Sequence, residues 1–246
     1  MAFFEARNLS KSYASRMIIE DIELHVEQGE IVGLLGVSGV GKSTLFNLLS
    51  GLEQPDQGAV IFEDRDVTGV PGQISYMQQK DLLLPFKTIK ENVCLPLLLK
   101  GTSSKEAKRE AEALLPVFGL EDSANQYPAQ LSGGMRQRAA LLRSFFFAQK
   151  MMLLDEPFSA LDAITKRSMH AWFAKMRQEL NLTVLLISHD IDEVLLLADR
   201  LYIMNGKPGH ITAEFATTWQ GERDLETTLS PEFSNLKRMV LIQLQE

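Results

Sequence analysis

The segment from Gly36 to Thr44 has the composition and spacing of a loop that binds the phosphates of a nucleotide. It matches the pattern Gly-x-x-x-x-Gly-Lys-Ser/Thr in full, and it lies between the apolar run Ile31 to Leu35 and a predicted helix. Glycines let backbone N–H groups turn toward phosphate oxygens, and the positive end of the following helix favours the same anion. A glycine-rich turn with a chance lysine is the alternative, and the flanking strand and helix argue against it.

The side chains at the end of this loop have expected partners on the nucleotide and its metal ion. We expect Lys42 to reach the β- and γ-phosphates, the Ser43 hydroxyl to bind Mg²⁺, and Thr44 to hydrogen-bond near the α-phosphate. The residues predicted to surround the phosphates are Gly36, Ser38, Gly39, Gly41, Lys42, Ser43 and Thr44.

A pair of carboxylates follows the apolar run Met151 to Leu154. Asp155 lies at the carboxyl end of this predicted strand, where ligands bind in open α/β sheets, so we expect it to face Mg²⁺. Glu156, the next residue, is expected to polarise the attacking water as a general base. The alternative is a pair of carboxylates that only ends an ordinary strand.

A histidine and a second glycine-rich segment also have the chemistry to contact phosphate. His189 follows the apolar run Val184 to Ile187, and its imidazole is suited to donate a hydrogen bond to a γ-phosphate. Ser132 and the glycines after it precede a helix-compatible stretch, which favours a second anion site. Each pattern has a structural alternative: a histidine beside a strand, and a serine that caps a helix.

The apolar pattern indicates which elements position these residues. Strands are predicted at 17–26, 31–35, 58–62, 151–154, 184–187 and 201–204, and helices at 42–50 and around the stripe Met169, Trp172, Phe173, Met176 and Leu180. The region from about Thr88 to Gln130 is predicted to be helical, with a capping box at Ser103 and Glu106 and a helix end near Gly119. The tail from Ile211 has no readable pattern. Alternating strands and helices predict an α/β fold with a mostly parallel sheet covered on both faces.

Composition limits the function classes. Lys and Arg total 25 against 32 Asp and Glu, and this formal charge of −7 disfavours a nucleic-acid partner. Cys94 is the single cysteine, which excludes an intrachain disulfide. The start has no signal-peptide pattern, and the apolar runs are far shorter than the roughly 20 residues that span a bilayer. We therefore expect a soluble protein.

Taken in order, these motifs resemble the ATP-binding subunit of an ABC transporter over roughly residues 3 to 215. The resemblance covers the phosphate loop, the signature segment Leu131 to Gln137, the acidic pair, the D-loop Ser159 to Asp162, and His189 as the switch histidine. It implies that Tyr13 stacks on adenine. It also implies ATP as the nucleotide, with Ser132, Gly133, Gly134 and Asp162 as further nucleotide-binding residues.

The family also has a glutamine that links Mg²⁺ to a helical subdomain, and this chain offers both Gln78 and Gln79. Relatives usually have an aromatic residue just before that glutamine and a proline six residues after it. Pro85 lies six residues after Gln79, which favours Gln79 as the Mg²⁺-side residue, and Gln78 then replaces the aromatic residue. Met135 also replaces the more usual glutamine of the signature segment.

The resemblance implies a P-loop NTPase fold with a RecA-like core, an antiparallel β subdomain and an inserted helical subdomain. A single domain over 1–246 would comprise the core and β subdomain at 1–87 and 136–246, with the helical subdomain at 88–135 ending in the signature motif. Two subunits, identical or different, would stack head to tail with ATP between them. Expected partners are integral membrane permease subunits and a substrate-binding protein, at the cytoplasmic side of the inner membrane.

The stretch Leu82 to Val93 resembles a Leu-Pro-aromatic segment found in the ATP-binding subunits of importers for nitrate, sulfonates, taurine and pyrimidine precursors of thiamine. Its leucines would either form a groove for a coupling helix of the membrane subunit or belong to the core. An exporter or lipid-trafficking ATPase would share every predicted site residue. A soluble ABC ATPase of DNA repair or translation is disfavoured by the acidic charge and the single cassette.

Overall fold

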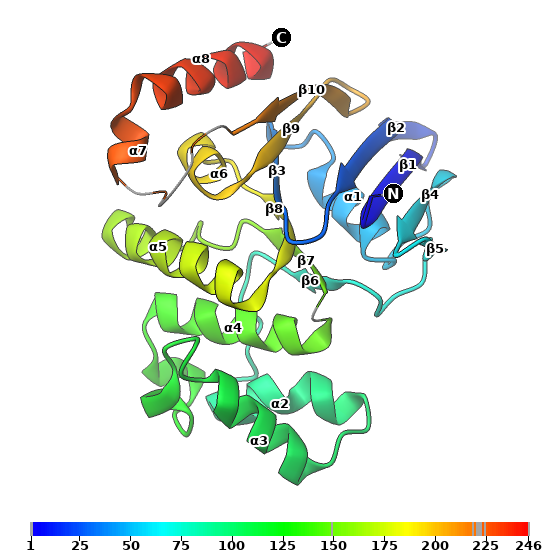
Figure 1. Cartoon of the computed structure of the whole chain (residues 1–246). Helices are drawn as coiled ribbons and strands as arrows, with labels where there is room; N and C mark the ends of the chain where they lie inside the picture. Colours follow the sequence, from blue (N-terminus) through cyan, green and yellow to red (C-terminus); the bar gives the residue numbers. More distant parts are fainter. Residues whose placement is uncertain (1, 149, 218, 220–222, 224, 246) are drawn as a thin grey trace.

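Strands of the chain form two sheets within the residues that the computed structural model describes, which are 2–148, 150–217, 219, 223 and 225–245 (Figure 1). The antiparallel sheet has the order β2-β1-β4-β5, with β1 at Phe4–Tyr13, β2 at Arg16–Val26, β4 at Gln57–Phe62 and β5 at Arg65–Asp66. The larger sheet has the order β10-β9-β3-β8-β7-β6. Its strands are β3 (Ile31–Gly36), β6 (Ser75–Met77), β7 (Met151–Asp155), β8 (Thr183–Ile187), β9 (Arg200–Asn205) and β10 (His210–Ala216).

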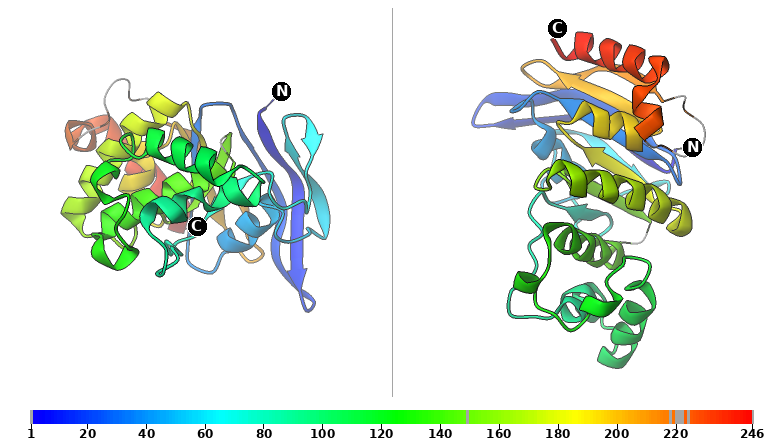
Figure 2. Two further views of the ribbon diagram at one scale, coloured as in Figure 1. Left: turned by 90° about the horizontal axis from the view of Figure 1, so that it is seen from below. Right: turned by 90° about the vertical axis from the view of Figure 1, so that its left-hand side faces the viewer.

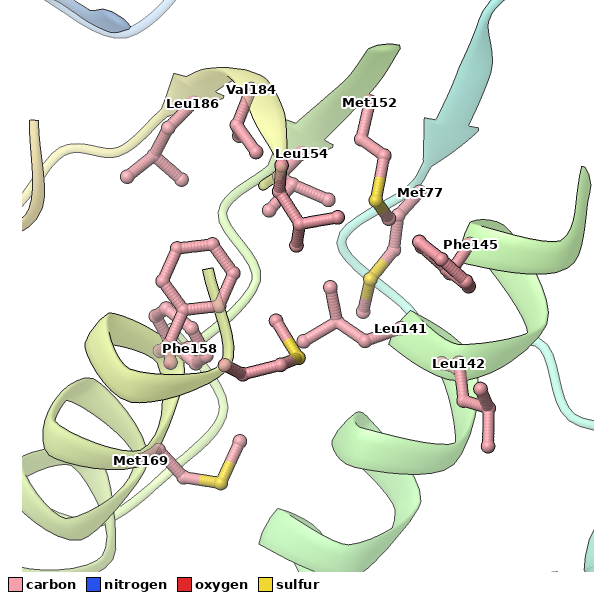
Figure 3. Packing of buried hydrophobic residues seen from close by; sticks show 14 of the residues in the cluster. Met77, Leu141, Leu142, Phe145, Met152, Leu154, Phe158, Met169, Val184 and Leu186 are labelled. Carbon is pink, nitrogen blue, oxygen red and sulfur yellow. The ribbon is translucent and has the colours of Figure 1, made fainter. Parts of the chain in front are cut away.

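The larger sheet is parallel from β9 to β6, and β10 pairs antiparallel with β9. Its central strands are buried on both sides, which is why they are continuous apolar runs. Met152 and Leu154 of β7 belong to one core cluster, whereas Met151 and Leu153 belong to the other. Figure 3 shows the first cluster, in which Leu154 faces Phe158 and Leu141. The predicted fold class, a mostly parallel sheet covered on both faces with an antiparallel sheet beside it, is confirmed.

The helices are α1 (Lys42–Leu49), α2 (Ile89–Leu99), α3 (Ser104–Leu114), α4 (Gly133–Phe147), α5 (Ala163–Leu180), α6 (Ile191–Leu197), α7 (Leu225–Leu229) and α8 (Pro231–Gln245). Short 3₁₀ turns lie at Glu121–Ser123 and Pro128–Gln130. Figure 2 shows α4 and α5 stacked between the larger sheet and the α2–α3 pair. Among the described helices, none combines the length and the apolar character that crossing a bilayer requires.

The middle of the chain is helical, as expected, but its helix ends differ in detail. At Ser103 only half of the expected capping box forms: the side chain accepts a bond from Glu106 N, 3.3 Å away. The complete box is at the start of α2, where Glu91 Oε2 also accepts a bond from Thr88 N. The prediction that the following helix ends near Gly119 was wrong, because α3 ends at Leu114. Pro116 comes two residues later and cannot continue the helix.

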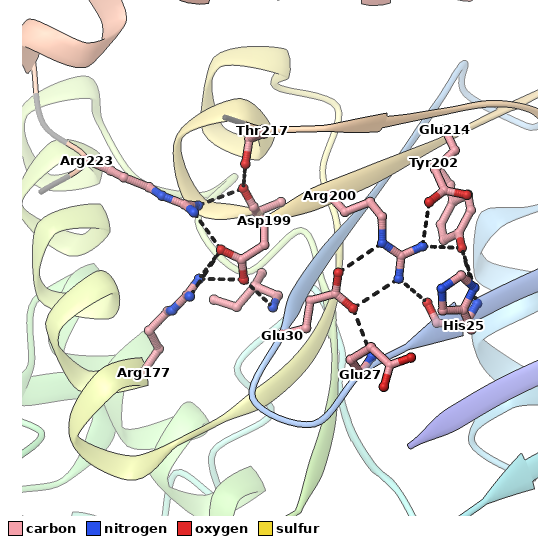
Figure 4. Close-up of polar contacts among 12 residues, drawn as sticks. His25, Glu27, Glu30, Arg177, Asp199, Arg200, Tyr202, Glu214, Thr217 and Arg223 are labelled. Atoms are coloured by element: carbon pink, nitrogen blue, oxygen red, sulfur yellow. Dashed lines mark hydrogen bonds and ion pairs between the residues drawn. The ribbon is translucent and has the colours of Figure 1, made fainter. Parts of the chain in front are cut away.

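The sequence prediction lacked β1, β5, β6, α6 and the elements of the tail. Strand β1 was not predicted because shifts in its register with β2 interrupt the alternation of buried and exposed side chains. The tail forms β10, α7 and α8, although 218, 220–222, 224 and 246 of this segment lie outside the described residues. Arg223 attaches the tail to the core through an ion pair with Asp199, which Arg177 also contacts (Figure 4).

Candidate nucleotide site

The phosphate-binding loop connects the central strand β3 to α1, as its sequence predicts. Gly36 ends β3, the side chains of Ser38 and Ser43 are exposed, and Gly41 is the N-cap of α1. Gly39 has a φ of +80°, and nothing lies within 4 Å of the Cβ that another residue would add. Glycine is therefore needed there for backbone conformation and not for space. The loop is open to solvent at the carboxyl edge of the sheet, where parallel strands place their ligands.

Lys42 folds back beneath this loop. Its Nζ donates to the carbonyl oxygens of Gly36, at 2.7 Å, and Val37, at 3.0 Å. Burial lowers the pKa of Lys42, and the nearby carboxylates Glu156 and Asp155 oppose that effect. The ammonium group is thus close enough to the acidic pair for their charges to interact, which unites the first two predicted motifs in one site.

Asp155 ends β7 and has a hydrogen-bond partner that the sequence did not indicate. Tyr76 of the neighbouring strand β6 donates its hydroxyl to Asp155 Oδ2 at 3.2 Å. Burial raises the pKa of Asp155, and the Tyr76 hydrogen bond opposes this effect. The Tyr76 ring packs edge-on against Phe46 of α1, with ring centroids 5.6 Å apart. No pattern around Tyr76 shows that β6 pairs with β7, so sequence reasoning had no signal for this contact.

Glu156 is the meeting point of segments that are far apart in the sequence. Its Oε2 lies 3.0 Å from His189 Nδ1 and accepts a bond of 3.1 Å from Gln79 Nε2. Its backbone N–H donates to Ile187 O at 2.8 Å, and its φ is +47°. A positive φ in a residue with a side chain is strained, and such strain concentrates at functional sites. The structure therefore brings the predicted general base, the predicted switch histidine and one candidate glutamine together.

The two candidate glutamines point to different surroundings. Gln79 reaches Glu156, and it also donates to Ser159 Oγ at 3.3 Å. Gln78 instead lines a hollow beside α2, together with Leu95 and Leu99. This difference favours Gln79 as the residue next to the acidic pair, in agreement with its spacing from Pro85.

The signature segment and the D-loop lie side by side at the junction of α4 and α5. Ser132 caps α4, and its Oγ accepts a bond from Met135 N at 3.3 Å. A Cβ added to Gly134 would lie 3.1 Å from Thr165 Cγ2, so glycine permits the close packing of α4 on α5. An added Cβ at Gly133 would lie 3.3 Å from Leu161 Cδ2. Gly133 therefore lies beside the residue that precedes Asp162, and Gly134 packs against the first turn of α5.

Asp162 and Tyr13 each have a structural partner in this chain. Asp162 caps α5, because its Oδ1 accepts bonds from the N–H groups of Ile164 and Thr165. Tyr13 ends β1, its hydroxyl donates to Glu53, and its ring is 42% exposed. Burial and Glu53 raise the pKa of Tyr13, while a hydrogen bond with Thr44 lowers it. Tyr13 therefore lies beside the last residue of the phosphate-binding loop.

The stretch Leu82 to Val93, predicted to form either a docking groove or part of the core, has both buried and exposed apolar residues. Leu83, Ile89 and Val93 are buried in the core. Leu82 and Phe86 are 53% and 72% exposed. A largely apolar hollow of about 370 Å³ is lined by other residues, among them Leu52, Ile74, Leu95 and Leu99.

Comparison with known proteins places this arrangement in context. The family model "ABC transporter" matches residues 19–159. The formylaminopyrimidine import ATP-binding protein ThiZ of Halalkalibacterium halodurans is 45% identical over 95% of this chain and 92% of its own length. The nitrate import ATP-binding protein NrtD of Synechocystis sp. is 39% identical over 85% of this chain and 79% of its own. The taurine import ATP-binding protein TauB of Pseudomonas aeruginosa is 38% identical over 92% and 88%.

A solved structure agrees with the fold. The ATP-binding cassette MJ0796, in a dimeric post-hydrolysis state bound to ADP and Pi, superposes with a TM-score of 0.74. It is 29% identical, and the superposition covers 88% of this chain and 100% of that one. The same cassette is also described as a dimer in a second structure with the same TM-score of 0.74.

Proposed function

Because this chain belongs to the ABC transporter family as an ATP-binding ATPase, we propose that it powers the import of a small anion or organic nutrient. The observation that carries the proposal is the convergence of Gln79 and His189 on Glu156 next to the phosphate-binding loop. The relatives that import formylaminopyrimidine, nitrate and taurine support an importer and indicate the class of cargo. An exporter with the same catalytic residues is the second candidate.

Several residues of this chain have roles in the steps of ATP hydrolysis. The N–H groups of the loop and the Lys42 ammonium bind the β- and γ-phosphates, and Tyr13 stacks on the adenine. Glu156 accepts a proton from the attacking water while His189 orients the γ-phosphate. ADP and inorganic phosphate are then the products. The Lys42 ammonium group bonds to a carbonyl oxygen of the loop and interacts electrostatically with the two carboxylates. Binding of ATP would replace its bond to the neutral carbonyl oxygen by bonds to charged phosphate oxygens.

The residues around the acidic pair fit Mg²⁺. Ser43 offers a hydroxyl, Asp155 a carboxylate and Gln79 an amide oxygen, and these are hard oxygen donors of the kind Mg²⁺ prefers. Tyr76 donates a hydrogen bond to Asp155 Oδ2, so Oδ1 can bind the metal ion. Gln79 donates a hydrogen bond through its amide nitrogen, so its amide oxygen can also bind the metal ion. In the described part of the chain, no three His, Cys, Asp or Glu side chains gather as a metal site. When bound, Mg²⁺ would neutralise charge on the phosphate oxygens.

We propose that a second subunit completes each nucleotide site. The Ser132 hydroxyl caps α4, and Gly133 and Gly134 lie against Leu161 of the D-loop and Thr165 of α5. The dimeric state of MJ0796 supports a paired arrangement. In this arrangement, the Ser132 hydroxyl and the N–H groups at the start of α4 face the γ-phosphate held by the partner. The partner is either a second copy of this chain or a related subunit.

The membrane subunits would dock at the hollow beside α2. Leu52 and Leu99 are 56% and 83% exposed at its rim, and together with the hollow they offer apolar surface that a partner can cover. Gln78 lines the same hollow, so the residue next to Gln79 would contact the partner. This docking would hold the chain at the cytoplasmic face of the membrane, and it supports the helical region 88–135 as the part that receives the permease.

Reconstitution tests the proposal. The chain would be purified with the membrane subunits that accompany it, placed in proteoliposomes with a substrate-binding protein, and supplied with ATP. We expect ATP-dependent uptake of formylaminopyrimidine, nitrate or taurine, and none when the chain carries Glu156→Gln. Outward transport would favour an exporter, and ATP hydrolysis that never moves a solute would contradict a transport role.

A further inference from the structure

A buried ion-pair cluster links the start of α5 to the residue that follows His189. Lys166 lies in the first turn of α5, where its N–H donates to Asp162 O at 2.8 Å. Its Nζ lies 2.7 Å from Asp190 Oδ2 and 2.9 Å from Glu193 Oε2. His170 Nε2 lies 3.1 Å from the same Glu193 oxygen. Lys166, His170, Asp190 and Glu193 are called the Lys166 cluster below.

The burial of this cluster distinguishes it from a surface ion pair. The side chain of Glu193 is 1% exposed and that of Lys166 is 17% exposed, whereas that of Asp190, at the edge of the cluster, is 35% exposed. Burial opposes the charge of Lys166, but its contacts with Asp190 and Glu193 outweigh this effect and raise its pKa. Burial also acts against ionised Glu193, but His170 and Lys166 hold its pKa below the usual value. Removing one partner of a buried charge pair leaves the other charge without compensation, which destabilises the protein far more than the loss of an exposed pair does.

The Lys166 cluster fixes Asp190, the residue that follows His189 in the loop between β8 and α6. Asp190 Oδ1 accepts a bond from Glu193 N at 3.2 Å, and Asp190 N donates to Ser188 Oγ at 3.1 Å. Ser188 is 2% exposed, whereas the His189 side chain is 62% exposed. The position of His189 is therefore restrained more by the neighbouring residues Ser188 and Asp190 than by the packing of its own side chain. Its contact with Glu156 depends on where Ser188 and Asp190 hold the backbone.

We propose that Lys166 is a positioning residue, which couples the D-loop Ser159 to Asp162 to His189. The coupling is a short physical path: Asp162 caps α5, Lys166 follows on its first turn, and its ammonium fixes Asp190 next to His189. His189 then meets Glu156 only while the start of α5 is in place. The inference rests on the proposed roles of Glu156 and His189. It adds a link between the surface expected to face the second subunit and the catalytic carboxylate.

Substitutions at both ends of the link test it in the full-length chain. Lys166→Met removes the charge and keeps a long side chain, while Lys166→Arg keeps the charge. Asp190→Asn keeps an effective helix cap but loses the ion pair, and it leaves Lys166 paired with Glu193. Lys237→Met is the matched control, because Lys237 pairs with Asp192 of α6 at 2.6 Å, an ion pair that includes no member of the Lys166 cluster. Steady-state ATPase kcat and KM are measured for each variant.

We expect Lys166→Met to lower kcat by about 5- to 50-fold, the order of loss that misplacement of a catalytic group causes, with KM within about twofold. Asp190→Asn should show a smaller fall of the same kind, Lys166→Arg should recover most of the activity, and Lys237→Met should keep the wild-type kcat. In a His189→Ala background, measured in single turnover, Lys166→Met should cause no further loss.

Three results would overturn the coupling. One is an equal fractional loss from Lys166→Met with and without His189→Ala, and another is a fall in kcat for Lys237→Met as large as for Lys166→Met. The third is an unchanged kcat for Asp190→Asn, which decides the matter even where Lys166→Met does not fold. Failure of the importer proposal would be seen separately, as ATP hydrolysis by the wild-type complex without solute uptake.

Discussion

Glu156 Oε2 and His189 Nδ1 lie 3.0 Å apart and join the carboxyl ends of the neighbouring strands β7 and β8. The pairing is anchored on the backbone as well, because Glu156 N donates to Ile187 O at 2.8 Å. Each residue follows a buried apolar strand, so the sheet fixes their separation before any ligand arrives. The carboxylate is thereby held near the loop that is expected to carry the γ-phosphate.

The different surroundings of the two glutamines predict that only substitution of Gln79 impairs the ATPase. Gln79→Ala should lower kcat by about tenfold or more and raise the Mg²⁺ concentration needed for half-maximal activity, because Gln79 contacts Glu156 and is a proposed metal ligand. Gln78→Ala is the matched control, with kcat near wild type in the purified chain, since Gln78 lines the hollow beside α2. A Mg²⁺ titration of the ATPase rate checks both. The assignment would be reversed if Gln78→Ala gave the larger loss.

A mixing experiment tests whether each site uses two subunits. Lys42→Ala and Ser132→Arg should each abolish most ATPase activity alone, the first through the phosphates and the second through the signature segment. In an equal mixture, each mixed dimer contains one intact site, so about a quarter of wild-type activity should return if the subunits exchange freely. A mixture that stays inactive, although mixed dimers are detected by mass spectrometry, would place both residues in one subunit's site.

The Lys166 cluster predicts how stability depends on pH. The pKa of Glu193 is lower in the folded chain than its usual value, so its contribution is complete above the unfolded pKa of about 4.3 and is lost as pH falls through the folded value. Glu193→Gln should therefore cost about 1–3 kcal/mol at pH 7, and this cost should shrink below about pH 4. Urea unfolding of both chains at several pH values measures the difference. A cost that stays constant from pH 7 to pH 3 would contradict the role of the charge.

The sequence predicted the phosphate-binding loop and the strands that carry Glu156 and His189 because each is a contiguous pattern. A run such as Met151 to Leu154 is buried on both faces, so it needs no partner to be recognised. The order of the motifs along the chain then supplied the family resemblance. What the sequence lacked was information on which segments lie next to one another.

Two contacts that were missed, those of Tyr76 and Lys166, depend on such long-range neighbours. Tyr76 contacts Asp155 only because β6 pairs with β7, and Lys166 contacts Asp190 only because α5 packs beside α6. Neither residue has a local pattern that distinguishes it from an ordinary tyrosine or lysine. Strand β1 was missed for a local reason, since bulges disturb its alternation.

The central claim is that Glu156 accepts the proton of the attacking water, and Glu156→Gln tests it most directly. Glutamine keeps the size of the side chain and its ability to bond with Gln79 and His189, but it cannot act as a base. Single-turnover hydrolysis of radiolabelled ATP should slow by about 10²- to 10⁴-fold, while ATP remains bound and light scattering shows a stable dimer. The control variant Glu179→Gln, which changes an exposed glutamate in the same way, should hydrolyse ATP at the wild-type rate. Hydrolysis by Glu156→Gln at the wild-type rate would contradict the account.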